Sequence, residues 1–406
     1  MSKKKSRKKY RKFSRKRRKK VISLESASRK KPLVRIKVVG VGGAGGNVIT
    51  RMGRDFVRGV DFIAINTDIQ DLECCDAKQK LHIGRVSTKG LGAGMNPDLG
   101  RQAAEENQTE IVEALKDADM IFIAAGFGGG TGTGAAPVVA DIARESGALT
   151  VAVVTKPFTF EGSQRIKIAE EGVMKIKDKV DSLLIIPNDR IFSVIDNNTP
   201  VLKAFEKIDD ILKSAVSGIA EIIASSGLVN VDFADIKTIM ADSGTAVVGV
   251  GTAEGKDRSV KAASQAINSP LLEISIDGAK GVLFCIAGGR DLKMVEISEI
   301  AKIITKNIDP GAKIIFGAYQ DRKLKAGQIK VTLVATGFNG LSIRKEGPLN
   351  LFASSGGVRE STESKEDAEE TEIKNIGGKI KKVEKETVKK DEDVWDIPTF
   401  LRKKKK

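Results

Sequence analysis

Residues 126–134 read GFGGGTGTG, a glycine-rich run that begins where the apolar segment 120–125 ends. Glycine allows backbone conformations that other residues avoid, and the N–H groups of such a run can form a concave site for an anion. Thr131 and Thr133 add two hydroxyl groups. Because a helix is expected directly afterwards, at 135–146, the run has the position of a phosphate-binding loop at a helix N-terminus.

A second glycine-rich run, GVGGAGG at residues 40–46, follows the apolar segment 34–39 in the same way. Residues 40–45 fit the pattern G-x-G-x-x-G, which by itself suggests a nicotinamide- or flavin-dependent oxidoreductase. Such an enzyme needs only one pyrophosphate loop, whereas two loops at neighbouring strand ends favour a longer phosphate chain. The sequence contains no G-x-x-x-x-G-K-[ST] motif, which excludes a P-loop nucleotide hydrolase.

The first half of the chain alternates short apolar segments with longer helical ones. Strands of this kind, buried on both faces and separated by helices, are typical of a parallel sheet in an α/β domain, for which we expect bounds of 33–200. Ligands of such sheets bind beyond the carboxyl ends of the strands, where both glycine-rich runs lie. The expected strands are 34–39, 62–65, 81–83, 120–125, 150–154 and 183–186, and the expected helices include 97–116 and 135–146.

A single long helix is expected over residues 201–227, because apolar residues recur there every three or four positions. Thr199 is a suitable N-cap, Pro200 a suitable first residue and Gly227 a suitable C-terminal stop. A helix of this length spans about 40 Å and can connect two domains. Residues 228–346 are predicted to form a smaller α+β domain.

Charge divides the chain into a basic arm and a neutral remainder. Residues 1–32 contain 17 of the 69 Lys and Arg residues but one of the 53 acids, so the net charge of +16 belongs to this arm. The arm is too polar to fold, and residues 347–390 have the composition of a disordered linker. Residues 391–406 then include the apolar octet VWDIPTFL at 394–401, which has the character of a docking peptide.

Cysteine, histidine and hydropathy exclude several classes of function. Cys74, Cys75 and Cys285 lack the spacing of metal ligands, so no protein-bound metal site is predicted, and few thiols are typical of a reducing compartment such as the cytoplasm. His82 is the only histidine and is expected to be structural, which argues against zinc hydrolysis and Ser-His-Asp catalysis. No apolar run reaches the ~20 residues that a membrane span requires.

Several motifs together resemble the FtsZ branch of the tubulin/FtsZ GTPase superfamily. The run GGGTGTG at 128–134 is similar to the signature loop of that superfamily, a highly specific match. Two residues, Phe127 and Lys237, depart from the family pattern, where Met and Arg are frequent. The resemblance covers about residues 33–346 and the tail, and its further motifs are GVGGAGGN (40–47), NTD (66–68), GLGAG (90–94), TKPFTFEG (155–162), NVDFADI (230–236) and WDIPTFLRK (395–403).

The resemblance implies that GTP or GDP lies across the strand ends of the first domain, with Mg²⁺ beside its phosphates. Thr131 is implied to lie near the phosphate oxygens and Mg²⁺, Phe205 to stack on the guanine, and Asp210 to accept guanine N–H groups that adenine lacks. The other implied contacts are Gly43, Ala44, Gly45, Gly46, Asn47, Gly130, Gly132 and Thr133 around the α- and β-phosphates, Ala93 and Gly94 at the γ-phosphate, Glu161 and Arg165 at ribose and phosphate, and Asn47 and Asn188 at the guanine.

The nucleotide pocket contains no obvious general base, and the best acidic candidates are Asp232 and Asp235, after the long helix. By resemblance, this acidic loop enters the pocket of the next subunit and polarises the attacking water, with Asn230 supporting the site. From spacing alone, Asp232 can equally be an N-cap and Asp235 the acid of a capping box. A member of the superfamily that binds GTP without hydrolysing it is the corresponding alternative, against which the two acids argue.

The resemblance also implies a head-to-tail homopolymer that forms the cell-division ring, in the cytoplasm at mid-cell. Residues 394–403 are implied to dock onto membrane-tethering and regulatory division proteins, and the terminal basic residues 402–406 would add weak attraction to anionic lipid. For the arm 1–32, the open alternatives are nucleic acid, an anionic membrane, acidic segments of neighbouring linkers and no dedicated partner. A close paralogue of the ring-forming protein is a further alternative.

Overall fold

The computed structural model describes residues 34–54, 59–193, 195–196, 198–224, 228–269, 275–306, 308–321, 324–325 and 327–338. The predictions for the arm 1–32, the linker 347–390 and the tail 391–406 concern residues outside this part of the chain. Within it, no helix has the length and apolar character that crossing a bilayer requires.

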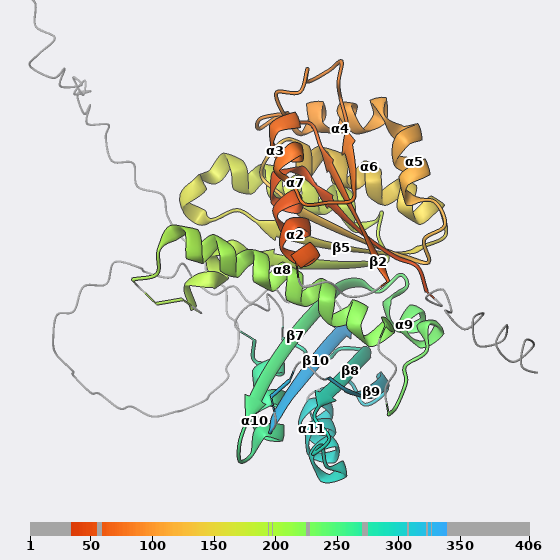
Figure 1. Ribbon diagram of the computed structural model, residues 1–406, viewed down its shortest axis with the longest axis vertical. Coiled ribbons are helices and arrows are strands. Elements are labelled where there is room, and N and C mark those ends of the chain that lie inside the picture. Colours follow the sequence, from red (N-terminus) through yellow and green to blue (C-terminus); the bar gives the residue numbers. More distant parts are fainter. Residues whose placement is uncertain are drawn as a thin grey trace, which may run out of the picture. The chain divides into compact units, whose positions relative to one another are not determined.

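The first part of the fold is a parallel sheet with helices on both faces (Figure 1). Its strands are arranged in the order β3-β2-β1-β4-β5-β6, and every neighbouring pair is parallel. The α/β class predicted from the alternating segments is therefore confirmed. The strands are β1 Ile36–Val41, β2 Val60–Asn66, β3 Gln79–His82, β4 Met120–Gly126, β5 Leu149–Lys156 and β6 Ser182–Pro187.

Alternate residues of the central strands enter two separate hydrophobic cores. In β1, Val38 packs on one face and Val39 on the other, and in β4 Phe122 and Ile123 divide in the same way. The first core is covered by helices α2 Gly42–Arg54, α3 Ile69–Cys74 and α8 Val201–Ala224, and the second by α4 Pro97–Glu106, α5 Gln108–Leu115, α6 Thr131–Glu145 and α7 Ser163–Lys177. Two short 3₁₀ helices, η1 Thr159–Glu161 and η2 Asn188–Ser193, follow β5 and β6.

The strand order reverses between β1 and β4, because the chain adds β2 and β3 on one side of β1 and β4, β5 and β6 on the other. In open parallel sheets, ligands bind at the carboxyl ends of the two strands that flank such a reversal. β1 continues into α2 and β4 leads to α6, so both glycine-rich runs lie at this position. Two segments that are far apart in the sequence thus become neighbours.

The single helix predicted over 97–116 is wrong, because this segment forms two helices, α4 and α5, that meet at Asn107. Asn107 leaves the helical conformation, with φ −111° and ψ 26°. Its Oδ1 accepts a hydrogen bond from the N–H of Gly84 at 2.8 Å, and its Nδ2 donates to Glu110 at 3.1 Å. These contacts override the helical periodicity, because the Asn107 side chain bonds to the backbone of the distant Gly84 and to Glu110.

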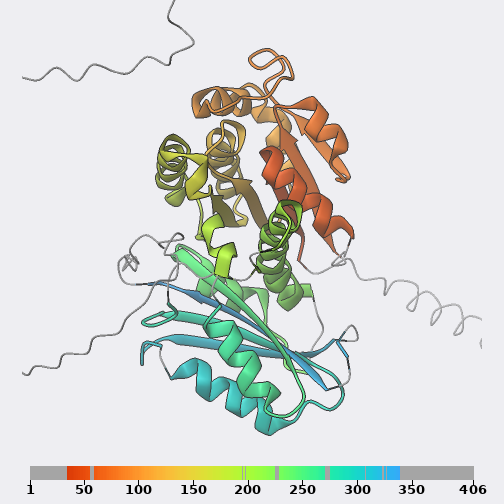
Figure 2. The ribbon, with the colours of Figure 1, turned by 90° about the vertical axis from the view of Figure 1, so that its left-hand side faces the viewer.

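The second part of the fold is a mixed sheet whose two faces are also covered (Figure 2). Its strand order is β7-β10-β8-β9, with antiparallel pairs on both sides of β10 and a parallel pair between β8 and β9. Helices α10 and α11 cover one face, while α8 and α9 pack against the other. The elements are α9 Phe233–Met240, β7 Gly244–Glu254, α10 Arg258–Ile267, β8 Gly281–Gly288, α11 Met294–Thr305, β9 Lys313–Gln320 and β10 Gln328–Thr336.

Helix α8 connects the two sheets through a shared core. Its buried residues Leu212, Val216 and Ile219 belong to the same hydrophobic core as Val38 of β1 and Val334 of β10. Strands β6 and β7 also form a short parallel pair at the junction. The helix therefore packs against both sheets, in addition to connecting them along the chain.

Candidate functional site

Both helices that follow the glycine-rich runs begin inside them. α2 starts at Gly42, directly after β1, and α6 starts at Thr131, about one turn earlier than the predicted start at 135. Gly42 has φ +74°, a left-handed conformation that glycine adopts at low cost, and it turns the chain from the strand into the helix. Part of each glycine-rich run is therefore the first turn of a helix, and only the rest is a loop.

Some glycines of these runs are packing positions. A Cβ at Gly45 would lie 2.5 Å from the carbonyl oxygen of Ala124, and a Cβ at Gly132 would lie 2.4 Å from that of Gly126. Only glycine therefore allows α2 and α6 to approach the strands of the sheet so closely.

Gly94 and Gly129 face free space instead. A Cβ at Gly94 would meet no atom within 4 Å, and a Cβ at Gly129 would meet only the carbonyl oxygen of Gly94, at 3.9 Å. The backbone is thus open here to a ligand that a side chain would exclude. The N–H of Gly130 donates to the carbonyl of Gly94 at 2.6 Å, which places the loop of Ala93 and Gly94 beside the start of α6.

The N-termini of α2 and α6 differ from those of their neighbours. Asp68 and Asn96 cap α3 and α4, each by accepting hydrogen bonds from two backbone N–H groups. α6 has no side-chain cap, and neither α2 nor α6 carries an acidic residue in its first turn. No acid within these two first turns offsets the partial positive charge of the helix ends, which suits the α6 end to bind phosphate. At the α2 end, the carboxylate of Asp71 on α3 would lie 3.0 Å from a Cβ at Gly43.

The two hydroxyl groups of the second run have different environments. Thr133 is buried, and its Oγ1 accepts a hydrogen bond from the N–H of Gly128 at 2.9 Å. Thr131 is half-buried, and its Oγ1 lies 2.6 Å from Oγ1 of Thr67, just after β2. Thr131 therefore offers a partly accessible, oriented hydroxyl, whereas the Thr133 hydroxyl is already used to hold the turn before α6.

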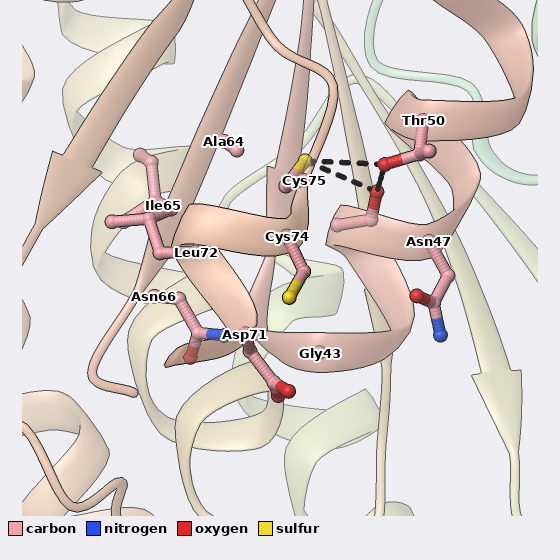
Figure 3. Close-up of a pocket in the computed structure, with 12 residues that line it drawn as sticks. Gly43, Asn47, Thr50, Ala64, Ile65, Asn66, Asp71, Leu72, Cys74 and Cys75 are labelled. Carbon is pink, nitrogen blue, oxygen red and sulfur yellow. Dashed lines mark hydrogen bonds between the residues drawn. The ribbon is translucent and has the colours of Figure 1, made fainter. Parts of the chain in front are cut away.

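A pocket lies between the first turns of α2, the end of β2 and helix α3 (Figure 3). Gly43, Gly46 and Asn47, three of the predicted nucleotide contacts, line it. Asp71 and Cys74 of α3 line it too, and the sequence did not single them out. Their signal was the NTD motif at 66–68, which marks the turn from β2 into α3 but does not show which side chains of that helix face α2.

The segment after β5 lies beside the second glycine-rich run. A Cβ at Gly128 would lie 3.1 Å from Pro157 and 3.2 Å from the carbonyl oxygen of Arg165. Glu161 accepts hydrogen bonds from the N–H of Phe158 at 2.9 Å and from the Arg165 guanidinium at 2.6 Å. Two predicted site residues, Glu161 and Arg165, thus form an ion pair next to the second glycine-rich run.

The η2 segment is attached to the same loop. Asp189 accepts hydrogen bonds from the N–H of Thr159 at 3.1 Å and from its hydroxyl at 2.5 Å. Beside it, the buried Oδ1 of Asn188 has no hydrogen-bond partner in the described part of the chain. A buried polar atom without a partner costs about 1–3 kcal/mol, so Asn188 is suited to bind a ligand that supplies a donor.

Phe205 belongs to an aromatic cluster at the start of α8. Phe158, at the centre, is 3% exposed, stacks on Phe160 with a centroid distance of 4.7 Å, and meets Phe205 edge to face at 5.7 Å. Phe205 itself is 47% exposed, so one side of its ring is available to a flat ligand.

Two adjacent acids of α8 have different environments. Asp209 accepts a hydrogen bond from Arg51 of α2 at 2.8 Å, and burial raises the pKa of its carboxyl while Arg51 opposes that shift. No ion pair in the described residues involves Asp210, whose backbone carbonyl alone accepts a bond, from Ser214 at 2.6 Å. Asn47 lies one turn before Arg51 on α2 and lines the pocket beside α3.

The acidic loop lies apart from these groups. From Asp210 to the end of α8 the helix rises about 20 Å, and Asp232 and Asp235 come after that end. Asp232 occupies the N-cap position of α9, but its side chain accepts no capping hydrogen bond. The capping alternative therefore explains the position of Asp232 but not the role of its carboxylate, which makes no capping hydrogen bond. Both carboxylates belong to exposed residues.

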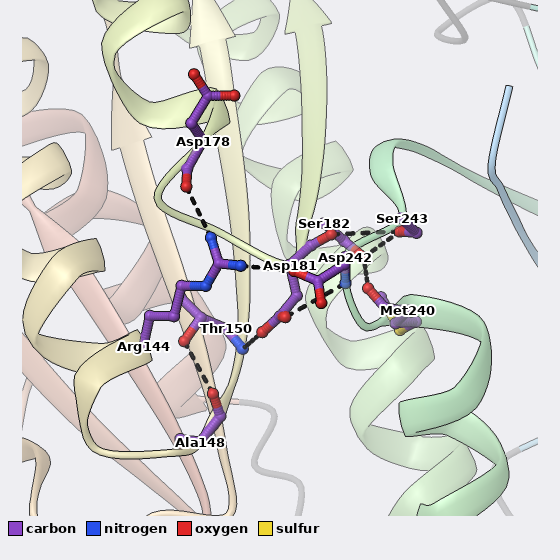
Figure 4. Close-up of polar contacts among 9 residues, drawn as sticks. All are labelled: Arg144, Ala148, Thr150, Asp178, Asp181, Ser182, Met240, Asp242 and Ser243. Atoms are coloured by element: carbon purple, nitrogen blue, oxygen red, sulfur yellow. Dashed lines mark hydrogen bonds and ion pairs between the residues drawn. The ribbon is translucent and has the colours of Figure 1, made fainter. Parts of the chain in front are cut away.

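The far end of α9 is attached to the first sheet (Figure 4). Ser182 of β6 donates a hydrogen bond to the carbonyl of Met240 at 2.7 Å, and the N–H of Asp242 donates to Asp181 at 3.3 Å. Arg144 of α6 pairs with Asp242 at 2.5 Å. The helix that carries the acidic loop is therefore held at its carboxyl end, and the loop projects from its amino end.

The structure gathers the predicted phosphate, ribose and guanine contacts at the carboxyl edge of the first sheet and the start of α8. It places Asn230, Asp232 and Asp235 beyond the opposite end of α8. At the carboxyl edge, Gly43, Ala44, Gly45, Gly46 and Asn47 lie in α2, Gly130, Thr131, Gly132 and Thr133 at the start of α6, Ala93 and Gly94 beside it, Glu161, Arg165 and Asn188 after β5 and β6, and Phe205 and Asp210 on α8.

Comparison with known proteins shows matches in both parts of the fold. Residues 35–196 match the GTPase domain of the tubulin/FtsZ family, and residues 244–339 match the C-terminal domain of the FtsZ family. An empty FtsZ dimer from M. jannaschii is 45% identical, and the match covers 79% of this chain and 92% of that one, with a TM-score of 0.72. A GTPγS-bound protofilament of CetZ2 from Haloferax volcanii is 21% identical over 76% of this chain and 95% of that one, with a TM-score of 0.66, and shows likeness of fold alone.

Proposed function

Because this chain belongs to the tubulin/FtsZ family of filament-forming GTPases, we propose that it binds GTP in one subunit and hydrolyses it at the junction with the next. The acidic loop of one subunit completes the nucleotide site of its neighbour. The polymer that results forms the cell-division ring, in the cytoplasm at mid-cell.

One observation carries this proposal: the two halves of the site lie at opposite ends of α8. Asp232 and Asp235 are exposed, and about 20 Å of helix separates their end of α8 from Asp210. A surface that binds a different surface of an identical copy repeats without closing and builds an open filament. Hydrolysis then requires assembly, and loss of the γ-phosphate weakens the junction.

The phosphates of GTP lie at the N-termini of α2 and α6, where Gly129 and Gly94 leave the backbone beside α6 accessible. The partly accessible Thr131 hydroxyl, held by Thr67, would help to hold the phosphate oxygens and Mg²⁺. When bound, Mg²⁺ neutralises charge on the β- and γ-phosphates. Asp232 and Asp235 of the neighbouring subunit orient the attacking water and accept its proton, as carboxylates do in general base catalysis, with Asn230 supporting them.

The guanine lies between α2 and the start of α8. Phe205 stacks on its ring, and the Asp210 carboxylate, which has no ion pair with any described residue, accepts the N–H groups of guanine that adenine lacks. Asn47 and the buried Oδ1 of Asn188 provide the remaining polar contacts. A nicotinamide- or flavin-dependent oxidoreductase would not require these groups or the second glycine-rich run.

The segments outside the described residues extend the proposal. Residues 394–403 combine an apolar octet with basic residues and would dock onto membrane-tethering and regulatory division proteins. The arm 1–32 would add weak contact with an anionic membrane or nucleic acid through its charge.

Phosphate release from GTP and ATP, measured at increasing protein concentration with sedimentation alongside, tests the proposed function. We expect GTP-selective turnover per molecule that rises steeply above a threshold concentration, together with polymer in the pellet. Turnover per molecule that does not depend on concentration would show that one subunit holds the whole site. Equal turnover of ATP would overturn the guanine contacts.

A further inference from the structure

Near the carboxyl end of α8, Glu221 reaches across to the second sheet. Its Oε2 accepts hydrogen bonds from Nζ of Lys330 on β10 at 2.8 Å and from the hydroxyl of Tyr319 on β9 at 3.2 Å. The side chains of Glu221 and Lys330 are each 22% exposed, and Tyr319 is 7% exposed. Three polar groups from three elements thus form one largely buried cluster, which we call the Glu221 node.

A second contact, one turn earlier, fixes the position of α8 on β10. A Cβ at Gly218 would lie 2.8 Å from Cγ2 of Thr332, so the helix approaches the strand this closely only because residue 218 is glycine. Gly218 and Glu221 lie on one face of the helix, and Thr332 and Lys330 lie on one face of the strand. The two contacts together determine both the rotation and the axial position of α8 on the second sheet.

The acidic loop begins on the strand that carries Tyr319. Val229 forms an antiparallel bridge with Ala318, in which the N–H of Val229 donates at 3.0 Å and the N–H of Ala318 donates back at 3.1 Å. Val231 packs on the next position of β9, since a Cβ at Gly317 would lie 2.8 Å from its Cγ2. Three consecutive residues of β9 therefore hold the Glu221 node and the start of the acidic loop.

From these contacts we propose that the Glu221 node positions the acidic loop for hydrolysis in the neighbouring subunit. Glu221 sets where α8 ends relative to β9, and Val229 and Val231 set where the loop leaves β9. If the contacts of the node break, the end of α8 and strand β9 move apart. The carboxylates of Asp232 and Asp235 then no longer reach the nucleotide of the neighbouring subunit. This inference rests on the proposed function, and the node residues act through the loop as positioning residues.

The burial of the node makes this positioning stringent. Removing one partner of a mostly buried ion pair leaves an uncompensated charge, so a broken node rearranges rather than persisting with a gap. Burial, assisted by the charge of Glu221, raises the pKa of Tyr319, so its hydroxyl remains a donor even in alkaline solution. A misplacement of about 1 Å at a reacting group can reduce a rate about 100-fold.

The test compares two quantities for each variant: the affinity of unassembled subunits for a fluorescent GTP analogue, and phosphate release per subunit in fully pelleted polymer. Glu221→Gln and Lys330→Met each remove one charge of the node while keeping most of the shape. We expect each to reduce turnover in the polymer by about tenfold or more and to leave GTP affinity within about twofold. The double exchange E221K/K330E restores opposite charges, and we expect it to recover most of the turnover.

The Arg258–Glu296 ion pair provides a matched control in the same domain. Nε of Arg258 lies 2.6 Å from Oε1 of Glu296, and the pair connects α10 and α11 on the face of the sheet opposite α8. Glu296→Gln should lower the melting temperature and leave turnover in the polymer unchanged. If Glu221→Gln and Glu296→Gln reduce turnover equally, the node has only a structural role and the proposal is overturned.

Tyr319→Phe keeps the test decisive if the charge variants do not fold. It removes one hydroxyl oxygen and preserves the ring, and we expect turnover in the polymer to fall about threefold with GTP affinity unchanged. Wild-type turnover in this variant would then overturn the positioning role. Wild-type protein that does not hydrolyse GTP on assembly would instead overturn the proposed function, so the two failures are distinct.

Discussion

The side-chain oxygens of Thr67 and Thr131 approach within 2.6 Å of each other across the gap between β2 and α6. Thr67 is fully buried, and its N–H bonds to Oδ1 of Asn66 at 2.8 Å. The contact connects the NTD motif to the second glycine-rich run. It explains how a half-buried threonine can hold its side-chain oxygen in one place.

Thr67→Val should weaken GTP binding about fivefold, because it removes the partner of the Thr131 hydroxyl at nearly constant volume, and a hydrogen bond of this kind contributes about 1 kcal/mol. Titration of unassembled protein with a fluorescent GTP analogue measures the effect. Thr67→Ser retains the hydroxyl and should bind GTP like the wild type. Unchanged binding by the valine variant would mean that the orientation of Thr131 does not matter to the nucleotide.

Asp235→Asn should reduce turnover in the polymer about 100-fold or more and leave GTP affinity within about twofold, because in the proposed mechanism the loop acts on the nucleotide of another subunit. Phosphate release and nucleotide titration separate these effects. Asp71→Asn is the matched comparison. Because Asp71 lines the pocket of its own subunit, this variant should change GTP affinity more than turnover in the polymer. Weakened GTP binding by Asp235→Asn would place the acidic loop in its own pocket.

Asp210→Asn should reduce the preference for GTP over ATP about tenfold or more, because hydrogen bonds to a charged acceptor contribute about 1.5–3 kcal/mol. Competition between the two nucleotides for the unassembled protein measures the preference. The neighbouring variant Asp209→Asn should leave the base preference unchanged, since Asp209 pairs with Arg51. A change of preference in Asp209→Asn alone would reverse the assignment of the two acids.

Gly129→Ala and Gly132→Ala should fail in different ways. The added methyl group at Gly129 enters free space, so we expect an unchanged melting temperature and GTP binding weakened about tenfold, where phosphate would lie. At Gly132 it would lie 2.4 Å from the carbonyl oxygen of Gly126, an overpacking that costs about 1–3 kcal/mol and lowers the melting temperature by several degrees. Thermal unfolding and nucleotide titration, run on both variants, distinguish the two. The opposite pattern would mean that Gly132 borders the phosphate site and that Gly129 is the packing position.

Local patterns in the sequence determined the elements and the class of the fold. Continuous apolar segments predicted the strands of the parallel sheet, and the 3.6-residue periodicity after Pro200 predicted a long helix, found at Val201–Ala224. The two glycine-rich runs marked the edge of the sheet where we propose that phosphate binds, because their position behind strands is visible in the chain itself. Each of these features depends on residues that are close together in the sequence.

Tertiary structure alone decided how these elements share their surfaces. Asn107 interrupts a periodic segment because Gly84, far away in the sequence, supplies a hydrogen bond. The close approach of Gly132 to Gly126, the partner of Thr131 and the presence of Asp71 in the pocket all depend on which elements pack together. No periodicity carries that information, since contacts between distant segments follow from the strand order of the sheet and the way α8 packs on both sheets.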